Sequence, residues 1–100
     1  MSFTQIIEID GVRDEQALRD HLARWDAEQA EAAPGYLGTR MLEEEGASGR
    51  YLVEVDFSSE DEAMRNNDRE ETAAWAEQLR ALIDGEPNYR NLHRRYSTAN

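Results

Sequence analysis

Residues 50–64 read RYLVEVDFSSEDEAM and contain the passage from strand to helix that decides the fold. In the first half, aromatic and β-branched side chains alternate with residues that include Glu54 and Asp56. This period of two predicts a strand over 50–57 with one apolar and one mostly polar face. A serine pair beginning at Ser58 can cap a helix, and the acidic residues after it suit the positive end of the helix dipole. A strand therefore leads directly into a helix.

Upstream of this segment the sequence predicts a strand, a helix and a second strand. Residues 3–9 form a β-rich run that ends at an Asp-Gly turn signal. Residues 13–33 lack Gly and Pro, and their apolar residues recur at spacings of three, four and seven, as on one face of a helix. The Pro34-Gly35 step stops this helix. Residues 36–43 then form the next strand.

The remaining segments complete a repeated pattern. Gly and Ser in 44–49 predict an antiparallel hairpin between the flanking strands. The second helical region has a short piece over 60–66, a break at an Asn-Asn-Asp sequence, and a longer piece over 69–83. An Asp-Gly pair and a proline end it, and residues 89–96 form the last strand.

The order of these elements predicts an α+β, ferredoxin-like βαββαβ domain over residues 1–100. Right-handed crossovers give a four-stranded antiparallel sheet in the order 4-1-3-2, with the helices on one face. The uncovered face carries Glu8, Glu54 and Asp56, with Arg90 and Arg94 opposite them if the last strand has the matching register. This face is either solvated or paired with another subunit.

Length and composition restrict the class of protein. One hundred residues with 39% apolar content form one domain, and so short a chain gains stability from a partner subunit. The sequence has no cysteine, which excludes disulfides and thiolate metal sites. It also lacks both a long apolar run and a signal-like N-terminus. We expect a soluble, cytoplasmic protein.

The charge excludes two kinds of partner. The chain has 22 acidic and 11 basic residues, a net charge of −11, and every cation is arginine. A surface with this much negative charge repels phosphate backbones and anionic lipids. We therefore expect neither nucleic acid nor membrane as a partner. The absence of lysine is consistent with either genome bias or adaptation to high salt.

Three segments together resemble the antibiotic biosynthesis monooxygenase family of the dimeric α/β-barrel superfamily. They are APGYLGTRML (33–42), RYLVEVDFSSEDEAM (50–64) and DGEPNYRNL (84–92), with Trp75 on the helix between the last two. The resemblance covers nearly the whole chain. It implies a homodimer in which two sheets pack face to face, with a ligand pocket in each subunit between the sheet and the second helix.

The resemblance also implies an activity. Members oxygenate phenolic or quinol-type molecules without a cofactor, the substrate itself reducing dioxygen, or they degrade haem. The haem-degrading set needs an Asn on the first strand and a His on the second helical region, and this sequence has neither. We therefore expect a small aromatic ligand, no cofactor and no metal, the last also because the two histidines lie in no metal-ligand spacing.

Five residues are candidates for the site. We take Trp75 and His93 as catalytic, and Gln5, Arg40 and Tyr51 as substrate-binding. Trp75 would stack on a flat ring or pack in the core, and His93 would transfer a proton or be an ordinary strand histidine. Arg40 would bind an anionic oxygen or pair with an acid across the sheet. Gln5 contributes a hydrogen bond only if it points into the pocket.

Two further residues are more simply explained by packing. His21 lies on the apolar face of the first helix and is expected in the core or at an interface, and Trp25 in the core or at a subunit contact. Two functions remain open. The first is a homodimeric, cofactor-independent monooxygenase for a small aromatic or quinol-type molecule. The second is a non-catalytic dimeric α/β barrel that binds a small molecule or a protein partner.

Overall fold

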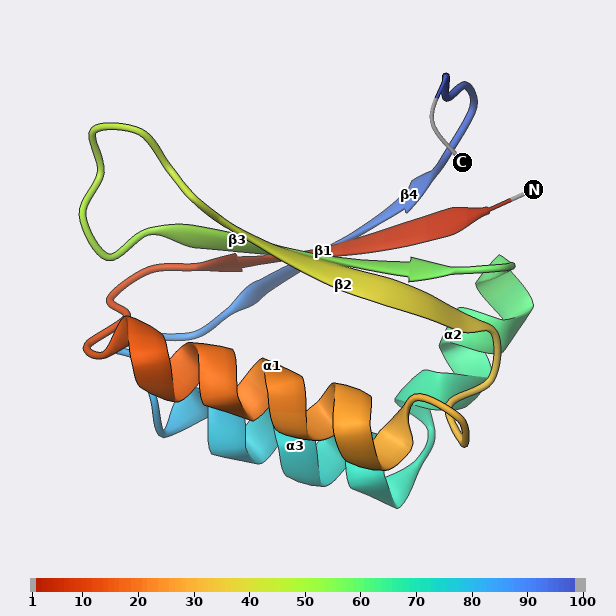
Figure 1. Cartoon of the computed structure of the whole chain (residues 1–100), viewed down its shortest axis with the longest axis horizontal. Coiled ribbons are helices and arrows are strands. Elements are labelled where there is room, and N and C mark those ends of the chain that lie inside the picture. Colours follow the sequence, from red (N-terminus) through yellow and green to blue (C-terminus); the bar gives the residue numbers. More distant parts are fainter. Residues whose placement is uncertain (1, 99–100) are drawn as a thin grey trace.

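The computed structural model describes residues 2–98. Its elements follow the expected βαββαβ order, with the second helical region split into two helices (Figure 1). They are β1 (Phe3–Ile9), α1 (Glu15–Gln29), β2 (Tyr36–Glu43), β3 (Tyr51–Phe57), α2 (Glu60–Asn67), α3 (Glu70–Arg80) and β4 (Asn88–His93). The ferredoxin-like α+β fold is confirmed.

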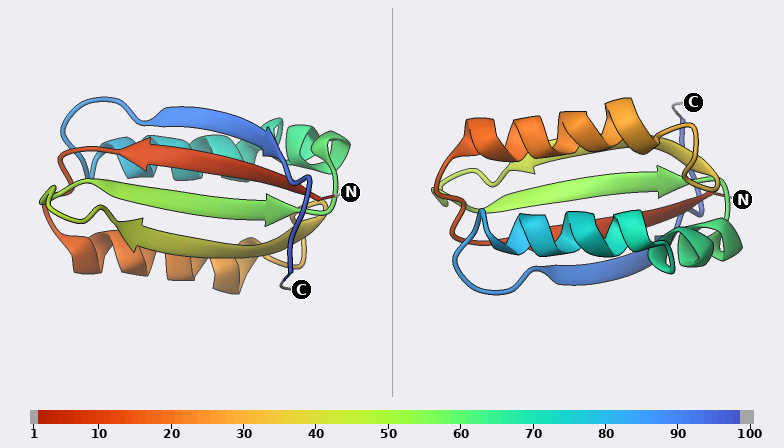
Figure 2. Two further views of the ribbon diagram at one scale, coloured as in Figure 1. Left: turned by 90° about the horizontal axis from the view of Figure 1, so that it is seen from above. Right: turned by 90° about the horizontal axis from the view of Figure 1, so that it is seen from below.

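The sheet has the predicted topology. Its four strands lie in the order β2-β3-β1-β4, and every neighbouring pair is antiparallel. Helices α1 and α3 cover one face, and no helix covers the other (Figure 2). Across the uncovered face, Ile6 pairs with Glu54 on β3 and with Arg90 on β4. The expected juxtaposition of acidic residues and arginines follows from this register.

Three predicted boundaries extend too far. The first helix ends at Gln29, because Ala33 precedes a proline and the residue before proline disfavours helical backbone. The α3 helix ends at Arg80, where the next turn tightens through hydrogen bonds from Ala81 and Leu82 to carbonyls three residues earlier. The last strand ends at His93 rather than residue 96, since the edge of β1 that it pairs with begins at residue 3.

Caps fix where two of the helices begin. The Asp14 carboxylate accepts hydrogen bonds from the backbone N–H groups of Gln16 and Ala17 at the start of α1. Ser59 caps α2 by accepting from the N–H of Glu62, whose carboxylate in turn accepts from the Ser59 hydroxyl. The chain thus enters α2 directly from β3, as residues 50–64 predict.

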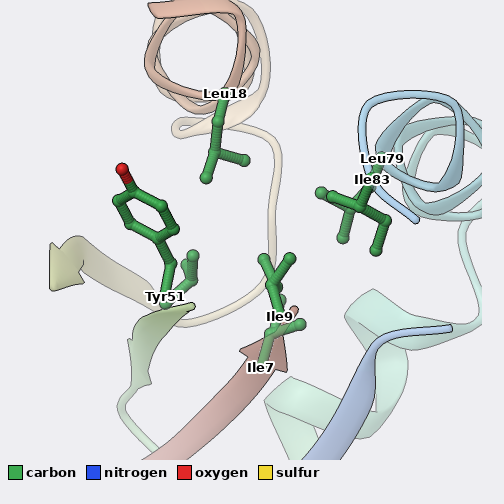
Figure 3. Close-up of a cluster of buried hydrophobic side chains, with 7 residues drawn as sticks. Ile7, Ile9, Leu18, Tyr51, Leu79 and Ile83 are labelled. Atoms are coloured by element: carbon green, nitrogen blue, oxygen red, sulfur yellow. The ribbon is translucent and has the colours of Figure 1, made fainter. Parts of the chain in front are cut away.

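The core consists of two separate clusters between the helices and the sheet. In the larger one, side chains from α1, α3 and one end of the sheet point toward one another (Figure 3). Its buried members are Ile7, Ile9, Leu18, Tyr51, Val53, Leu79 and Ile83. The smaller cluster lies at the other end, where Phe3 and Phe57 pack against Ala63 of α2. The row of sheet residues between the two clusters is different in character, and it positions the site.

Candidate functional site

A polar row crosses the helix-covered face of the sheet between the two core clusters. Thr39 and Gln5 both pair with Val55 from opposite sides, and Gln5 also pairs with Asn91. The Gln5 amide Nε2 donates to the Asn91 Oδ1 at 3.2 Å. Two carboxamides and a hydroxyl thus occupy positions where large apolar side chains would close the core. This row, one residue from each strand, is the floor of a cavity.

The helices supply the roof and walls. The cavity has a volume of about 340 Å³, within the range of small-molecule sites. Ala73 and Ala76 of α3 lie over it, and their small side chains leave the space open. Trp25 of α1 and Trp75 of α3 provide aromatic walls. The remaining lining residues are Ile7, Leu22, Phe57, Asn66, Asn67, Thr72, Arg80 and Tyr89.

Asn66 is held in one orientation at the end of the cavity near the α2–α3 junction. It is 5% exposed, and its Oδ1 accepts hydrogen bonds from Arg69 Nη1 and Thr72 Oγ1, both at 3.3 Å. The Nη2 of Arg69 donates to Gln29 Oε1 at 2.7 Å, which connects this network to α1. Because its oxygen is engaged, the amide nitrogen of Asn66 is the group available to a ligand as a donor.

The tryptophans form a stacked arrangement with His21. The Trp75 ring lies 4.8 Å from that of His21 at an interplanar angle of 10°, and Trp25 meets Trp75 edge to face at 6.1 Å. The Nε2 atom of His21 lies 3.0 Å from the carbonyl oxygen of Trp75. Burial lowers the pKa of His21. A neutral ring that donates from Nε2 fits this contact. One face of Trp75 is therefore covered by His21, and only the other can contact a ligand.

The indole nitrogen of Trp75 has an unusual environment. Within the described residues it is the one buried side-chain nitrogen or oxygen without a hydrogen-bond partner. Trp25 and Trp75 also line a smaller groove of about 180 Å³, which includes His21. The two tryptophans thus form the partition between the cavity and this outer groove.

The charge of the cavity contrasts with that of the protein. Among its described lining residues, Arg80 is the single charged group, and none is Asp, Glu or His. The Nε of Arg80 donates to Glu86 at 3.0 Å and its Nη1 to Glu77 at 3.1 Å. Tyr89 lines the same region, and its burial raises the pKa of its hydroxyl. The cavity is therefore neutral except for one cation near the end of α3.

The structure brings two of the five candidate residues to this cavity. Gln5 is part of its floor and Trp75 of its wall. Tyr51 lies instead in the larger core cluster, where a hydrogen bond to Glu15 at 2.7 Å raises the pKa of Tyr51 to about 12. Arg40 lies on the uncovered face of the sheet. His93 lies at the end of β4, with its side chain 55% exposed.

These displaced residues have other contacts. Arg40 pairs with Glu54 at 2.9 Å and with Asp56 at 3.6 Å. Of the two roles expected for Arg40, this is the pairing with acids across the sheet. His93 meets the ring of Phe3 edge to face at 5.3 Å, and its Nε2 lies 3.5 Å from Glu60. The sheet itself lies between Arg40 and the cavity, and the smaller core cluster lies between His93 and the cavity.

Sequence reasoning did not select Asn66, Thr72, Arg80, Tyr89 or Asn91. The Asn-Asn-Asp sequence was interpreted as a helix break, and α2 does end there. A polar pair at the end of a helix was the available signal for Asn66, but its burial depends on α3 folding back. For the others the sequence alone carries no distinguishing signal.

Two kinds of feature are absent from residues 2–98. No three or more His, Asp or Glu side chains are grouped so that they could hold a metal ion. None of the helices in this part of the chain is long and apolar enough to span a membrane.

The fold and the cavity define a ferredoxin-like α+β protein with a small-molecule pocket between its sheet and its helices. No protein-family model and no curated protein sequence matches the chain. Solved structures match over nearly its whole length. SnoaB from Streptomyces nogalater, a cofactor-independent oxygenase, is 17% identical with a TM-score of 0.81, over 99% of this chain and 98% of that chain.

Two other solved structures extend the comparison. A candidate antibiotic biosynthesis monooxygenase from Bordetella bronchiseptica is 17% identical, with a TM-score of 0.77 over 93% of this chain and 96% of its own. An EthD-family protein from Bacillus halodurans is 14% identical, with a TM-score of 0.70 over 94% and 99%. The chain therefore has the fold of the antibiotic biosynthesis monooxygenases, and the resemblance seen in the sequence holds at the level of the fold.

Proposed function

We propose that this protein is a homodimeric, cofactor-independent monooxygenase that acts on a small aromatic or quinol-type molecule in the cavity. The observation that carries the proposal is the cavity itself, an aromatic-walled space with a carboxamide floor that lies between the two core clusters and is open to solvent at the β4 edge. Aromatic walls suit a flat ring, and a few fixed polar groups suit its oxygen substituents. The likeness of fold to a cofactor-independent oxygenase supports the same reaction class.

The reaction needs no electron donor besides the substrate. For a phenol whose keto tautomer has an activated CH2 group, that group and O2 give a C=O group and H2O. The substrate supplies all four electrons. A C–O bond forms first, and the O–O bond then breaks as water leaves. The proton that the phenol loses at the start becomes part of the water molecule that leaves.

The cavity residues would bind and orient the substrate rather than exchange protons with it. Asn66 Nδ2 and the amides of Gln5 and Asn91 can bond to hydroxyl or carbonyl oxygens, while Trp75 contacts the ring. The described lining includes no carboxylate and no imidazole to accept a proton. We therefore expect the turnover rate to rise with pH in step with ionisation of the substrate phenol. His93, Tyr51 and Arg40 have no ligand contact in this proposal.

The uncovered face of the sheet supports the homodimer. Leu42 and Leu92 on this face are 45% and 37% exposed. The charged residues on the same face are already paired within the chain. Arg94 lies 2.9 Å from Asp56, and Arg40 lies 2.9 Å from Glu54. Paired charges can be covered by a second subunit without leaving any charge isolated. A second copy of the same face is the proposed partner.

The test is oxygenation of anthrone under ¹⁸O2. We expect protein-dependent formation of anthraquinone with one labelled oxygen, above the rate without protein. Ala76→Leu should abolish this activity by filling the cavity, whereas Ala74→Leu, on the same helix but lining only the outer groove, should retain it. Equal rates with and without wild-type protein would refute the enzymatic proposal for this substrate class.

The second candidate function is a non-catalytic binding protein, favoured by the absence of a proton acceptor from the described lining of the cavity. In that case anthrone or its analogues would quench the fluorescence of Trp25 and Trp75 with saturation. Ala76→Leu would remove the quenching, and no labelled product would form. Binding and isotope incorporation therefore separate the two functions.

A further inference from the structure

We infer that Arg80 makes the cavity selective for an elongated aromatic ligand with a carboxylate at one end. The inference rests on the proposed function in that it takes the cavity to be the ligand site. When the cavity is empty, the guanidinium Nε of Arg80 donates a hydrogen bond to Glu86, which lies in the loop after α3. The ligand carboxylate replaces Glu86 in this bond.

The first observation is the distribution of charge. The chain has 22 carboxylates in 100 residues, yet none belongs to the described lining of the cavity, and its one charged group is the Arg80 cation. A neutral ligand needs no cation at this place. A ligand carboxylate would meet an opposite charge and no like charge within the lining.

The second observation is the unused capacity of the guanidinium. Arginine has five N–H donors, and here Nε donates to Glu86 and Nη1 to Glu77. Within the described residues no hydrogen bond or ion pair involves Nη2 of Arg80. The side chains of Glu77 and Glu86 are 75% and 77% exposed, so their pairs with Arg80 are weak and solvent-screened. A carboxylate that approaches from the cavity can accept from Nη2 and replace Glu86 at Nε, in a two-bond geometry.

The third observation is the length of the cavity. Its lining extends along α3 from Thr72 to Arg80, a separation of eight positions and hence about 12 Å of helix. Asn66 and Thr72 lie at one end, where the amide N–H groups of Asn66 suit a hydroxyl or carbonyl oxygen, and Arg80 lies at the other. The matching ligand has fused rings, with an oxygen substituent at one end and the carboxylate at the other.

Two probes that differ only in the carboxylate test this inference. They are 6-hydroxy-2-naphthoate, which carries its hydroxyl and its carboxylate at opposite ends, and 2-naphthol, titrated without oxygen and followed by quenching of the two cavity tryptophans. We expect wild-type protein to bind the carboxylate probe at least about tenfold more tightly, as a charge-assisted pair would give. Arg80→Gln should abolish this preference and leave the affinity for the neutral probe unchanged. Glu86→Gln should increase it, because Arg80 is then freer.

Controls distinguish the reasons for failure. Arg65→Gln removes an exposed arginine of α2 that does not line the cavity, and it should retain the preference. Added salt should reduce the preference through screening. Equal affinities of wild-type protein for the two probes would overturn the inference and leave the proposed function standing. If Arg80→Gln lowered the affinity for both probes equally, the inference would also be overturned, since Arg80 would then only support the cavity wall. No binding of either probe would overturn the proposed function as well.

Discussion

Substitution of Asn66 tests how the end of the cavity is built. Asn66→Ala removes the acceptor for Arg69 Nη1 and Thr72 Oγ1 from a site that is 5% exposed. One of these bonds has a charged donor and the other a neutral one, so their loss costs about 3 kcal/mol. The better helix propensity of alanine returns about 0.5 kcal/mol. We expect a net loss near 2.5 kcal/mol, or a fall in Tm of about 10 to 20 °C for a domain of this size.

Asn66→Asp separates this structural role from ligand binding. The carboxylate keeps an acceptor for both donors and its charge lies beside Arg69, so unfolding free energy should stay within about 1 kcal/mol of wild type. The variant lacks the amide N–H donors, and the anthrone oxygenation rate or probe affinity should fall about tenfold or more. Urea unfolding and the ¹⁸O2 assay measure the two quantities. The reasoning is refuted if Asp destabilises as much as Ala, or if Asp retains full activity.

Three further predictions concern other parts of the molecule. Burial lowers the pKa of His21, so the unfolded chain binds more protons and stability should decline as pH falls through about 6.5; His21→Phe should reduce the decline of urea-unfolding free energy between pH 7.5 and 5.5, and an undiminished decline in this variant would contradict the assignment. Tyr51→Phe loses its bond to Glu15 and should lower unfolding free energy by about 1.5 kcal/mol in urea titrations, while probe affinity is unchanged. Leu92→Arg places a charge on the uncovered face and should convert the proposed dimer to a folded monomer in light scattering with unchanged circular dichroism; a dimer that persists in the variant would contradict the proposed interface.

Periodicity was sufficient to predict the architecture. The alternation in β3 and the turn residues around it determine which residues face the helices, and the uncovered face has the expected arginines opposite acidic residues, where Arg94 pairs with Asp56 and Arg90 with Glu8. These features depend on neighbours along the chain or across one strand. The ends of α1 and β4 were predicted less well, because the turn before Pro34 begins several residues ahead of the proline and because β4 ends where its pairing with β1 ends.

The site was only partly predictable for a geometric reason. Gln5 and Tyr51 both face the helices, as period two requires, but they lie at different heights on the sheet. Position along a strand relative to the helices above decides whether a side chain meets the core or the cavity, and a periodic pattern does not contain that information. His93 likewise faces the helix side but lies beyond the ends of α1 and α3, beside α2. Asn66 becomes a buried residue only through contacts with α3.

The polar row of Thr39, Val55, Gln5 and Asn91 has a consequence for how such a protein could change its ligand. Each strand contributes one member, and the two apolar clusters that hold the fold together lie on either side of the row. Val55 packs against both clusters, but Thr39, Gln5 and Asn91 belong to neither, so substitutions at these three positions change the chemistry of the cavity floor while both clusters keep their members. The proposed recognition and the folding of the chain thus depend on different side chains of one sheet, and a library varied at the three polar positions would explore new ligands at small risk to the scaffold.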